Sequence, residues 1–362
     1  MKYVALCVLV AGLACAQQTV PEIPFESVPN VLKLPPDLYL GEVSGVALNS
    51  KGHIFIFSRG NTTGPAYGAT ASQLLEFGPD GRFVREIGKN LYAWSYAHVV
   101  RVDRNDNIWA VDKGSDMIIK FTPDGRVSMV FGRKKEASDD PQPWKHVNPP
   151  LAAINGQFRQ PTDVTWDPAG DIFISDGYIN ARVAKYDKNG DWVKQWGEHG
   201  KEQGQFNTPH SIASDAKGNV YVADRGNRRI QVFDPDGTFL KEIKIDVPLP
   251  EVVHPWMGNP PSPQGAAAQN GAPWAICITP GPTQYLYSAD AYPGRVYKLS
   301  LDGTVLGVLG SSGRQPKQFG WIHEIACPSE NTIYVAEILN WRVQKLLLHP
   351  EKGPGTTSAG GR

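Results

Sequence analysis

The sequence predicts an all-β protein folded as a six-bladed β-propeller. Of its 362 residues, 37 are Gly, 30 are Pro and 10% are aromatic, a composition that suits many short strands joined by tight turns. Within the expected strands apolar and polar residues alternate, as in VYVAD at 220–224, which places one face of each strand in a core. One pattern of apolar strands closed by a D-G or N-G turn recurs six times, and a recurring unit of this kind is the signature of a repeat architecture.

Each copy of the repeat has a first apolar strand, a second strand that usually ends in an acidic residue, and a third strand. The copies read SGVALNSKGHIFIFSRG, HVVRVDRNDNIWAVDKGSDMIIKFTPDG, TDVTWDPAGDIFISDGYINARVAKYDKNG, HSIASDAKGNVYVADRGNRRIQVFDPDG, WAICITPGPTQYLYSADAYPGRVYKLSLDG and HEIACPSENTIYVAEILNWRVQKLLL. A sheet of about four strands cannot bury both faces alone, so six such sheets are expected to stack radially into a closed ring. The acidic strand ends are expected to bond turns and loops: Asp112, Asp176, Asp224, Asp290 and Glu337.

Closure of the ring requires a strand from outside the last repeat, because the pattern ends after Leu348. The stretch at 31–43, upstream of the first repeat, is the expected donor. Two long insertions, at 132–157 and 247–272, interrupt the repeat and are rich in Pro. They are expected to form loops at one rim of the ring, where substrate walls and lids are common.

The first residues, MKYVALCVLVAGLACAQQ, carry a Lys, a short apolar run and small residues around Cys15. This pattern predicts a signal peptide over 1–16 and an exported protein, either periplasmic or secreted. The run is shorter than the roughly 20 residues that span a bilayer, and a lipoprotein cut before Cys15 is the alternative. The remainder is predicted to be one propeller domain over 17–350 followed by a disordered tail at 351–362.

Charge and cysteine content limit the classes of partner. The 36 basic and 36 acidic side chains balance, which argues against a nucleic-acid binder. A closed ring with no open sheet edge is expected to be a monomer. Cys277 and Cys327 remain after cleavage, on comparable strands of neighbouring repeats. They form either one bridge or two buried thiols.

Aligning the repeats on their first strand gives one column of equivalent residues, called here the axial column: Ser44, His98, Thr162, His210, Trp274 and His323. Its histidines lie in the second, fourth and sixth repeats. Alternate blades of a six-membered ring are about 120° apart, so the three imidazoles would converge on the axis. Three imidazoles with an open coordination position are the ligand set of a catalytic zinc site. The other histidines are expected to be exposed in turns and loops: His53, His146, His199, His254 and His349.

Longer stretches carry a resemblance to a known family. They are LGEVSGVALNSKGHIFIFSRG, GKNLYAWSYAHVVRVD, FRQPTDVTWDPAGDIFISDGYINARV, WGEHGKEQGQFNTPHSIAS and IHEIA. From about Leu40 to Leu348 the chain resembles peptidyl-α-hydroxyglycine α-amidating lyase, a propeller of NHL repeats, and the phrases QPTDV, SDGY and G-Q-F-x-x-P-H-S are its most specific matches. The resemblance implies a zinc lyase that splits the N–Cα bond of a peptidyl-α-hydroxyglycine into a peptide amide and glyoxylate.

The resemblance also implies roles for individual residues. The family's three zinc ligands fall on the histidines of the axial column, its catalytic tyrosine in SDGY falls on Tyr178, and its catalytic arginine falls on Arg59. Its structural calcium, held by two backbone carbonyls and one carboxylate, would fall on Val46, Val100 and Glu324. Zinc would lower the pKa of the substrate hydroxyl, an ionised Tyr178 would take the proton, and Arg59 would pair with the substrate carboxylate or with the base.

The chain departs from the family pattern at several of these positions. Trp321 stands where the family usually has Met, and together with Trp274 it is expected to line the substrate pocket. Glu324 replaces the usual Asp of the calcium site, and Ile179 replaces a Cys, so the family's disulfides are absent. These departures leave open a substrate that is another α-hydroxyglycine-like compound or a different carbinolamide.

Two other functions compete with the lyase. One is a non-catalytic secreted NHL propeller that binds a peptide or a polysaccharide, which has no reason to keep histidines on alternate blades. The other is a hydrolase of lactones or phosphoesters with calcium held by carboxylates in the channel. The axial column contains no Asp or Glu, which argues against the hydrolase.

Overall fold

The computed structural model describes residues 20–60, 72–136, 147–250 and 270–349. The predicted signal peptide at 1–16 and the predicted tail at 351–362 lie outside these residues, as do parts of both insertions. Export, a single domain over 17–350 and a monomeric state therefore stay predictions. No helix in the described part of the chain is long and apolar enough to cross a membrane.

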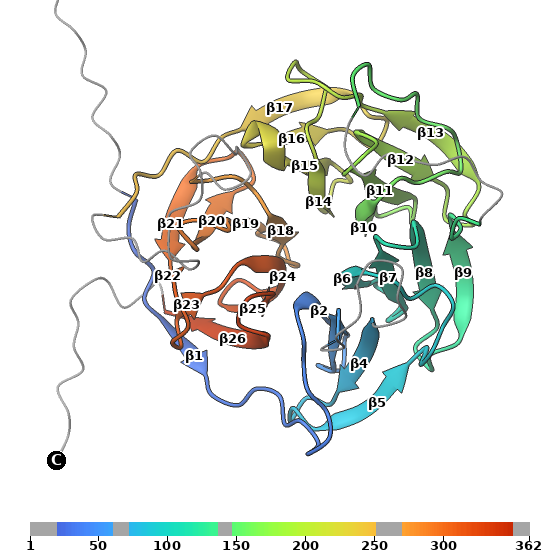
Figure 1. Ribbon diagram of the computed structural model, residues 1–362. Helices are drawn as coiled ribbons and strands as arrows, with labels where there is room; N and C mark the ends of the chain where they lie inside the picture. The colour runs from blue at the N-terminus through green and yellow to red at the C-terminus, as the bar shows by residue number, and fades with distance from the viewer. Residues whose placement is uncertain (1–19, 61–71, 137–146, 251–269, 350–362) are drawn as a thin grey trace, which may run out of the picture.

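The described residues form six four-stranded antiparallel sheets arranged radially around an axis (Figure 1). We call these sheets blades 1 to 6 and give their strands from the axis outward. Blade 1 contains β2 (Val43–Leu48), β3 (Ile54–Ser58), β4 (Gln73–Phe77) and β5 (Phe83–Ile87). Blade 2 contains β6 (Ala97–Val102), β7 (Ile108–Asp112), β8 (Met117–Phe121) and β9 (Val127–Phe131). Blade 3 contains β10 (Pro161–Trp166), β11 (Ile172–Asp176), β12 (Arg182–Tyr186) and β13 (Trp192–Trp196).

The remaining blades follow the same order. Blade 4 contains β14 (Pro209–Ser214), β15 (Val220–Asp224), β16 (Arg229–Phe233) and β17 (Phe239–Ile243). Blade 5 contains β18 (Ala275–Ile278), β19 (Tyr285–Ala289), β20 (Val296–Ser300) and β21 (Val305–Leu309). Blade 6 contains β24 (Ile322–Ser329), β25 (Thr332–Glu337), β26 (Arg342–Leu348) and β1 (Phe25–Val28). Three short elements complete the described set: the 3₁₀ turn Arg225–Asn227, β22 (Ser311–Ser312) and β23 (Gln318–Phe319).

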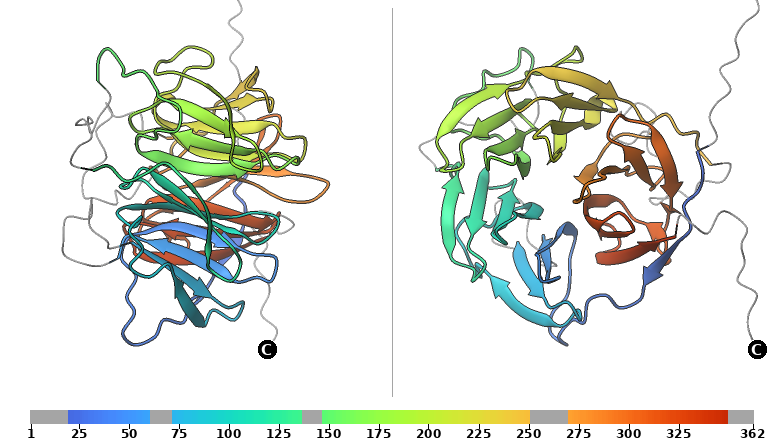
Figure 2. Two further views of the ribbon diagram at one scale, coloured as in Figure 1. Left: turned by 90° about the vertical axis from the view of Figure 1, so that its right-hand side faces the viewer. Right: turned by 180° about the vertical axis from the view of Figure 1, so that it is seen from behind.

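The all-β six-bladed propeller is confirmed, but the expected closing strand is wrong. The outer strand of blade 6 is β1, which pairs antiparallel with β26 from Phe25 opposite Leu348 to Val28 opposite Lys345. Residues 31–43 instead carry the chain from the outer edge of blade 6 past blade 1 to its innermost strand, as the blue segment in Figures 1 and 2 shows. The ring is thus joined between its N- and C-terminal ends, which removes the sheet edge that an open ring would expose.

The core lies between the blades rather than in one central mass. Six buried apolar clusters occupy the six interfaces between neighbouring blades, because each sheet has apolar side chains on both faces and each face needs a neighbour. Within the cluster between blades 5 and 6, Cys277 and Cys327 form a disulfide with their Cα atoms 6.1 Å apart. Of the two alternatives that the sequence left open, the bridge is therefore the one found.

The acidic residues at the ends of the second strands bond turns, as expected. Asp112 accepts hydrogen bonds from the backbone amides of Ser95, Tyr96 and Ser115. The other four acidic residues are likewise buried and accept hydrogen bonds from backbone amides of the loops beside them: Asp176, Asp224, Asp290 and Glu337. These carboxylates fix the loops above the inner strands, and so they help to position the site on the axis.

Candidate metal centre

The axial column is built by a repeated irregularity of the innermost strands. In five blades the column residue has no partner on the neighbouring strand, because the register shifts around it. These five residues are Ser44, His98, Thr162, His210 and His323. A residue left unpaired in this way is a β-bulge, which turns its side chain away from the regular alternation. The sixth member, Trp274, immediately precedes β18.

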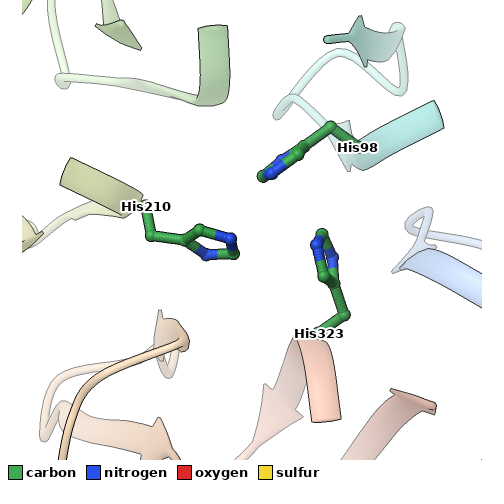
Figure 3. A group of neighbouring side chains, drawn as sticks. All are labelled: His98, His210 and His323. Carbon is green, nitrogen blue, oxygen red and sulfur yellow. The ribbon is translucent and has the colours of Figure 1, made fainter. Parts of the chain in front are cut away.

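The three column histidines meet on the axis of the ring. His98, His210 and His323, called here the histidine trio, point toward one another from blades 2, 4 and 6 (Figure 3). Each offers a ring nitrogen within 4.8 Å of those of the other two. Their ring centroids are 4.6 to 5.1 Å apart, and all three side chains are buried. The convergence that the repeat alignment predicted is confirmed.

The outer nitrogen of each imidazole is bonded to the backbone of the column residue that follows in the ring. His98 Nδ1 lies 2.6 Å from the carbonyl oxygen of Thr162, and His210 Nδ1 lies 2.7 Å from that of Trp274. His323 Nδ1 lies 2.8 Å from the carbonyl oxygen of Ser44 and so completes the circle. Because a carbonyl can only accept, Nδ1 carries the proton and Nε2 keeps its lone pair. Metal-binding histidines are usually oriented in this way.

Burial also keeps the trio neutral. The pKa of each histidine lies well below its ordinary value, mainly because burial penalises the charged imidazolium. Neighbouring charges add to the effect: the other two histidines at His98, Arg225 at His210 and Arg59 at His323. Protons therefore compete weakly for the Nε2 lone pairs at neutral pH, as a metal site requires.

A second set of equivalent residues lies beside the trio, and we call it the second ring: Arg59, Lys113, Tyr178 and Arg225, from blades 1 to 4. Each backbone amide donates to the carbonyl of the residue two positions before the column residue of its blade, over 2.9 to 3.3 Å. Repetition of one backbone bond thus places a phenol and three cations at equivalent positions of four blades. All four positions follow the end of the second strand of their blade.

Tyr178 brings its hydroxyl to the trio. The oxygen lies 2.8 Å from His210 Nε2 and 3.3 Å from His98 Nε2. The preceding Gly177 makes this approach possible, because a Cβ atom there would lie 2.0 Å from the carbonyl oxygen of Pro209. The glycine of the SDGY phrase therefore permits blades 3 and 4 to approach closely enough for Tyr178 to reach the trio.

Three cations lower the pKa of Tyr178. Burial by itself would raise its pKa, but Lys113, Arg225 and Arg59 outweigh burial and bring the pKa below the ordinary value of 10.0. The Lys113 ammonium lies 3.4 Å from the centre of the Tyr178 ring, and Arg225 Nη1 lies 3.5 Å from the Tyr178 oxygen. Positive charge around a buried phenol favours its ionised form, which is the form that can accept a proton.

Arg59 lies at the trio but does not bond Tyr178. Its Nη2 is 3.4 Å from His323 Nε2, its Nε donates to the carbonyl of Ala97 at 3.0 Å, and its Nη1 pairs with Glu42 at 2.8 Å. The guanidinium also stacks 4.0 Å above the ring of Tyr96. Arg59 is therefore fixed from three sides, with one edge facing the centre of the trio.

The two tryptophans assigned to the pocket lie together beside the trio. The rings of Trp274 and Trp321 have centroids 4.7 Å apart, and the ring of Trp274 is 4.9 Å from that of His210. Trp321 has a positive φ of 64°, which Gln160 and Thr208 share at the equivalent places in blades 3 and 4. The positive φ of Trp321 is thus a property of the repeat. The side chains of Trp321 and Trp274 together form an aromatic wall of the site.

Known proteins with related sequences include peptidyl-α-hydroxyglycine α-amidating lyases and peptidyl-glycine α-amidating monooxygenases. The NHL repeat model matches residues 206–233. The chain is 26% identical over 396 residues to peptidyl-alpha-hydroxyglycine alpha-amidating lyase 1 of Drosophila melanogaster, covering 96% of this chain and 68% of that protein. It is 29% identical over 332 residues to peptidyl-glycine alpha-amidating monooxygenase A of Xenopus laevis, covering 83% of this chain and 31% of that protein.

The chain is therefore similar in sequence to peptidyl-α-hydroxyglycine α-amidating lyases, and it contains an NHL repeat. It spans about a third of the length of the amidating monooxygenases that it matches. Among solved structures, it is similar to virginiamycin B lyase from Staphylococcus aureus, with a TM-score of 0.54, 13% identity, and coverage of 91% of this chain and 100% of that one. A gluconolactonase from Xanthomonas campestris gives a TM-score of 0.55 at 14% identity, with 93% and 99% coverage. At these identities the two structures support the fold alone.

The calcium site that the lyase family implies does not fit the contacts of this chain. Glu324 reaches the channel, but its Oε2 accepts hydrogen bonds from the backbone amides of Val46 and Val100, at 2.9 and 3.1 Å. Its Oε1 lies 3.1 Å from Nε of Arg101. Calcium requires six to eight oxygen ligands, whereas here a guanidinium faces the carboxylate. We therefore assign no calcium ion to Val46, Val100 and Glu324.

Four residues of the candidate site were missed in the sequence: Glu42, Tyr96, Lys113 and Arg225. A usable signal was present for two of them, because Lys113 and Arg225 directly follow the acidic residue that ends the second strand, as Arg59 follows Ser58. Alignment of the repeats at that point would have found both cations. Glu42 and Tyr96 carry no such signal, because their importance comes from contact with Arg59.

Proposed function

We propose that this chain is a zinc-dependent lyase that cleaves the N–Cα bond of a peptidyl-α-hydroxyglycine, or of a related carbinolamide, to an amide and glyoxylate. The observation that carries the proposal is the contact between Tyr178 and the trio: a phenol surrounded by cations, with its oxygen 2.8 Å from His210 Nε2. A base, three imidazole lone pairs and cationic groups then surround one point, as the reaction class requires. The names of the related lyases support the same assignment.

The trio fits a zinc ion on the chemistry of its donors. Three neutral imidazoles, each held by a backbone carbonyl at Nδ1, are a usual ligand set of catalytic zinc and leave a position open. A zinc ion bound to the three Nε2 atoms would act as a Lewis acid toward a substrate oxygen and lower the pKa of the substrate hydroxyl.

Tyr178 is the proton carrier of the proposed reaction. As a phenolate it takes the proton from the hydroxyl of the carbinolamide. The electron pair of that O–H bond forms the C=O bond of glyoxylate, and the C–N bond breaks with its pair going to nitrogen. The nitrogen takes the proton back from Tyr178 and leaves as the amide. Atoms and electrons balance without a further reactant.

The three cations of the second ring have two tasks in this proposal. They hold the pKa of Tyr178 below its ordinary value, and they supply charge for the carboxylate that becomes part of glyoxylate. Arg59 already pairs with Glu42, so Arg225, which also stacks 4.0 Å over Trp274, is the more suitable carboxylate partner. The aromatic wall of Trp274 and Trp321 would contact the acyl side of the substrate.

No specific observation favours the alternative of a non-catalytic secreted propeller that binds a peptide or polysaccharide. A binding face needs exposed groups, whereas the trio is buried on the axis. The hydrolase alternative would need a catalytic calcium on channel carboxylates, and the column supplies imidazoles instead.

The test measures zinc content and glyoxylate release on one zinc-supplemented preparation, with N-benzoyl-α-hydroxyglycine as substrate. We expect one zinc per chain and turnover, both lost in His210→Ala. The matched control is His53→Ala, because His53 lies outside the channel and pairs with Glu76; this variant should keep both zinc and turnover.

The possible outcomes separate the metal site from the reaction. Bound zinc without glyoxylate release, on this substrate and on a dansyl-peptide α-hydroxyglycine, would keep the metal centre and reject the lyase assignment. Absence of zinc from a folded wild-type protein would reject the mechanism altogether.

A further inference from the structure

A half-buried guanidinium lies next to the trio, further along the innermost strands. It belongs to Arg101, three residues after His98 on β6. Its charge is firmly held: burial opposes the charged form, but Asp163 and Glu324 outweigh burial and raise the pKa of Arg101 above its ordinary value. The proposed reaction uses none of these three residues.

The guanidinium is surrounded by oxygen atoms from four other blades. Nε and Nη2 of Arg101 donate to the two carboxylate oxygens of Asp163, at 2.9 and 2.6 Å. Nη2 also lies 3.3 Å from Ser211 Oγ and 3.3 Å from the carbonyl oxygen of Ile276, and Nη1 lies 3.2 Å from the carbonyl oxygen of Ile325. With Glu324 Oε1 at 3.1 Å, six oxygens face one cation.

Glu324 extends this network to blade 1, the remaining blade of the ring. Its second oxygen accepts from Val46 in blade 1 and Val100 in blade 2. Gly45 leaves room for it, since a Cβ atom there would lie 2.8 Å from Glu324 Oε2. All six blades therefore meet at one ionic cluster, and Glu324 and Val100 are close in sequence to His323 and His98.

Six oxygen atoms around one point, two of them from one carboxylate, match the number of ligands that a calcium ion requires. A guanidinium carries one positive charge where calcium carries two, but it presents that charge to several acceptors through a planar set of donors and needs no ion from solution. We propose that Arg101 is the resident cation of the axis at this level, in place of a metal ion, and that it joins the six blades around the histidine trio. This inference stands whatever reaction the trio performs.

The first experiment asks whether the wild-type protein responds to calcium. The protein is treated with a chelator, reloaded with zinc, and its thermal unfolding is followed with and without added Ca²⁺, alongside equilibrium dialysis against Ca²⁺. We expect no shift of Tm and no bound calcium. A calcium ion bound at one per chain, together with a rise in Tm, would overturn the proposal.

The second experiment removes the cation. Arg101→Ala leaves two buried carboxylates facing each other, so Tm should fall by on the order of 5 °C or more. A cavity of about 310 Å³ reaches Arg101 from the carboxyl ends of the inner strands, which gives Ca²⁺ a path to the six oxygens. We expect this variant to bind Ca²⁺ and to recover part of the lost Tm, a response that a merely structural side chain would not produce.

Arg104→Ala is the matched control, because Arg104 lies on the same blade and makes one exposed hydrogen bond to the carbonyl of Pro168; it should change neither Tm nor the response to calcium. Where Arg101→Ala does not fold, Arg101→Lys replaces it: this variant keeps the charge and loses the planar fork, so its Tm should lie below that of the wild type. An Arg101 variant with the wild-type Tm, or an Arg101→Ala protein that folds and ignores Ca²⁺, would overturn the proposal.

Discussion

Nδ1 of His98 donates a 2.6 Å hydrogen bond to the backbone carbonyl of Thr162, the equivalent residue of the next blade. Two further bonds of the same kind link His210 to Trp274 and His323 to Ser44. The Nδ1 atom of each imidazole is therefore held by the backbone of another blade and not by a side chain. The orientation of the three imidazoles therefore depends on the closure of the ring, because a shift between blades would move the acceptor of each histidine.

Removal of one imidazole should abolish the metal site without unfolding the ring. In His323→Gln we expect zinc to fall from one per chain to a small fraction, because two imidazoles do not complete a tight site. Ser44→Ala is the control, since His323 bonds the backbone of Ser44 and not its side chain, and zinc content should be unchanged. Metal analysis and circular dichroism of both variants check the prediction; zinc retained in His323→Gln would contradict it.

Loss of the phenolic oxygen should separate metal binding from turnover. Tyr178→Phe keeps the ring that faces Lys113 but removes the group that carries the proton, so kcat should fall by about 10² to 10⁴-fold with zinc still bound. Steady-state kinetics and metal content on the same sample decide the matter. A variant with wild-type kcat would show that Tyr178 is a wall of the pocket and not a base.

Lys113 should influence the pH dependence of the reaction. In the proposed reaction Tyr178 acts as a base when ionised, so activity should rise as pH passes its pKa. Nearby cations lower that pKa and should bring the rise to lower pH than an ordinary tyrosine would give. In Lys113→Met one of these charges is lost, the pKa of Tyr178 increases, and the rise of kcat/KM should move to higher pH. Lys120→Met, on the outer side of the same blade, is the control; identical profiles for Lys113→Met and the wild type would reject this role.

The disulfide should stabilise the ring between blades 5 and 6. It closes a segment of 50 residues between Cys277 and Cys327, and a cross-link of this length constrains the unfolded chain by about 2 to 4 kcal/mol. The double substitution Cys277→Ala and Cys327→Ala should lower the free energy of unfolding by that amount in denaturant titrations. Equal midpoints for the oxidised wild type and the double variant would argue against any stabilising effect.

The closing strand should be required for cooperative unfolding. A chain that begins at residue 31 lacks β1 and leaves β26 as an open edge, so we expect a lower and broader thermal transition than for a chain that begins at residue 17. Ser27→Ala tests one contact of the same strand, the 2.7 Å bond from Ser27 to Gln344, and should cost about 1 kcal/mol. A sharp transition at the wild-type Tm for the shortened chain would contradict the role of β1.

Repetition explains why so much of this site could be predicted. The trio follows from one alignment of the repeats, since residues at one repeat position share one backbone geometry, here a β-bulge on the innermost strand. Tyr178 and Arg59 came from resemblance to the family, although Arg59, Lys113 and Arg225 could have been found by aligning the repeats one strand later. Arg101 could not, because it lies beyond the bulge and only the convergence of six blades brings Asp163, Ser211 and Glu324 to its guanidinium.

The sequence by itself determined the number of blades, the axial column and the convergence of its histidines, because these depend on periodicity and on local patterns of apolar residues. Only the tertiary structure decided which segment closes the ring, whether Cys277 and Cys327 pair, and which cation lies on the axis beside Glu324. Each of these depends on contacts between residues far apart in the chain, for which local patterns carry no information: β1 with β26, blade 5 with blade 6, and Arg101 with four other blades.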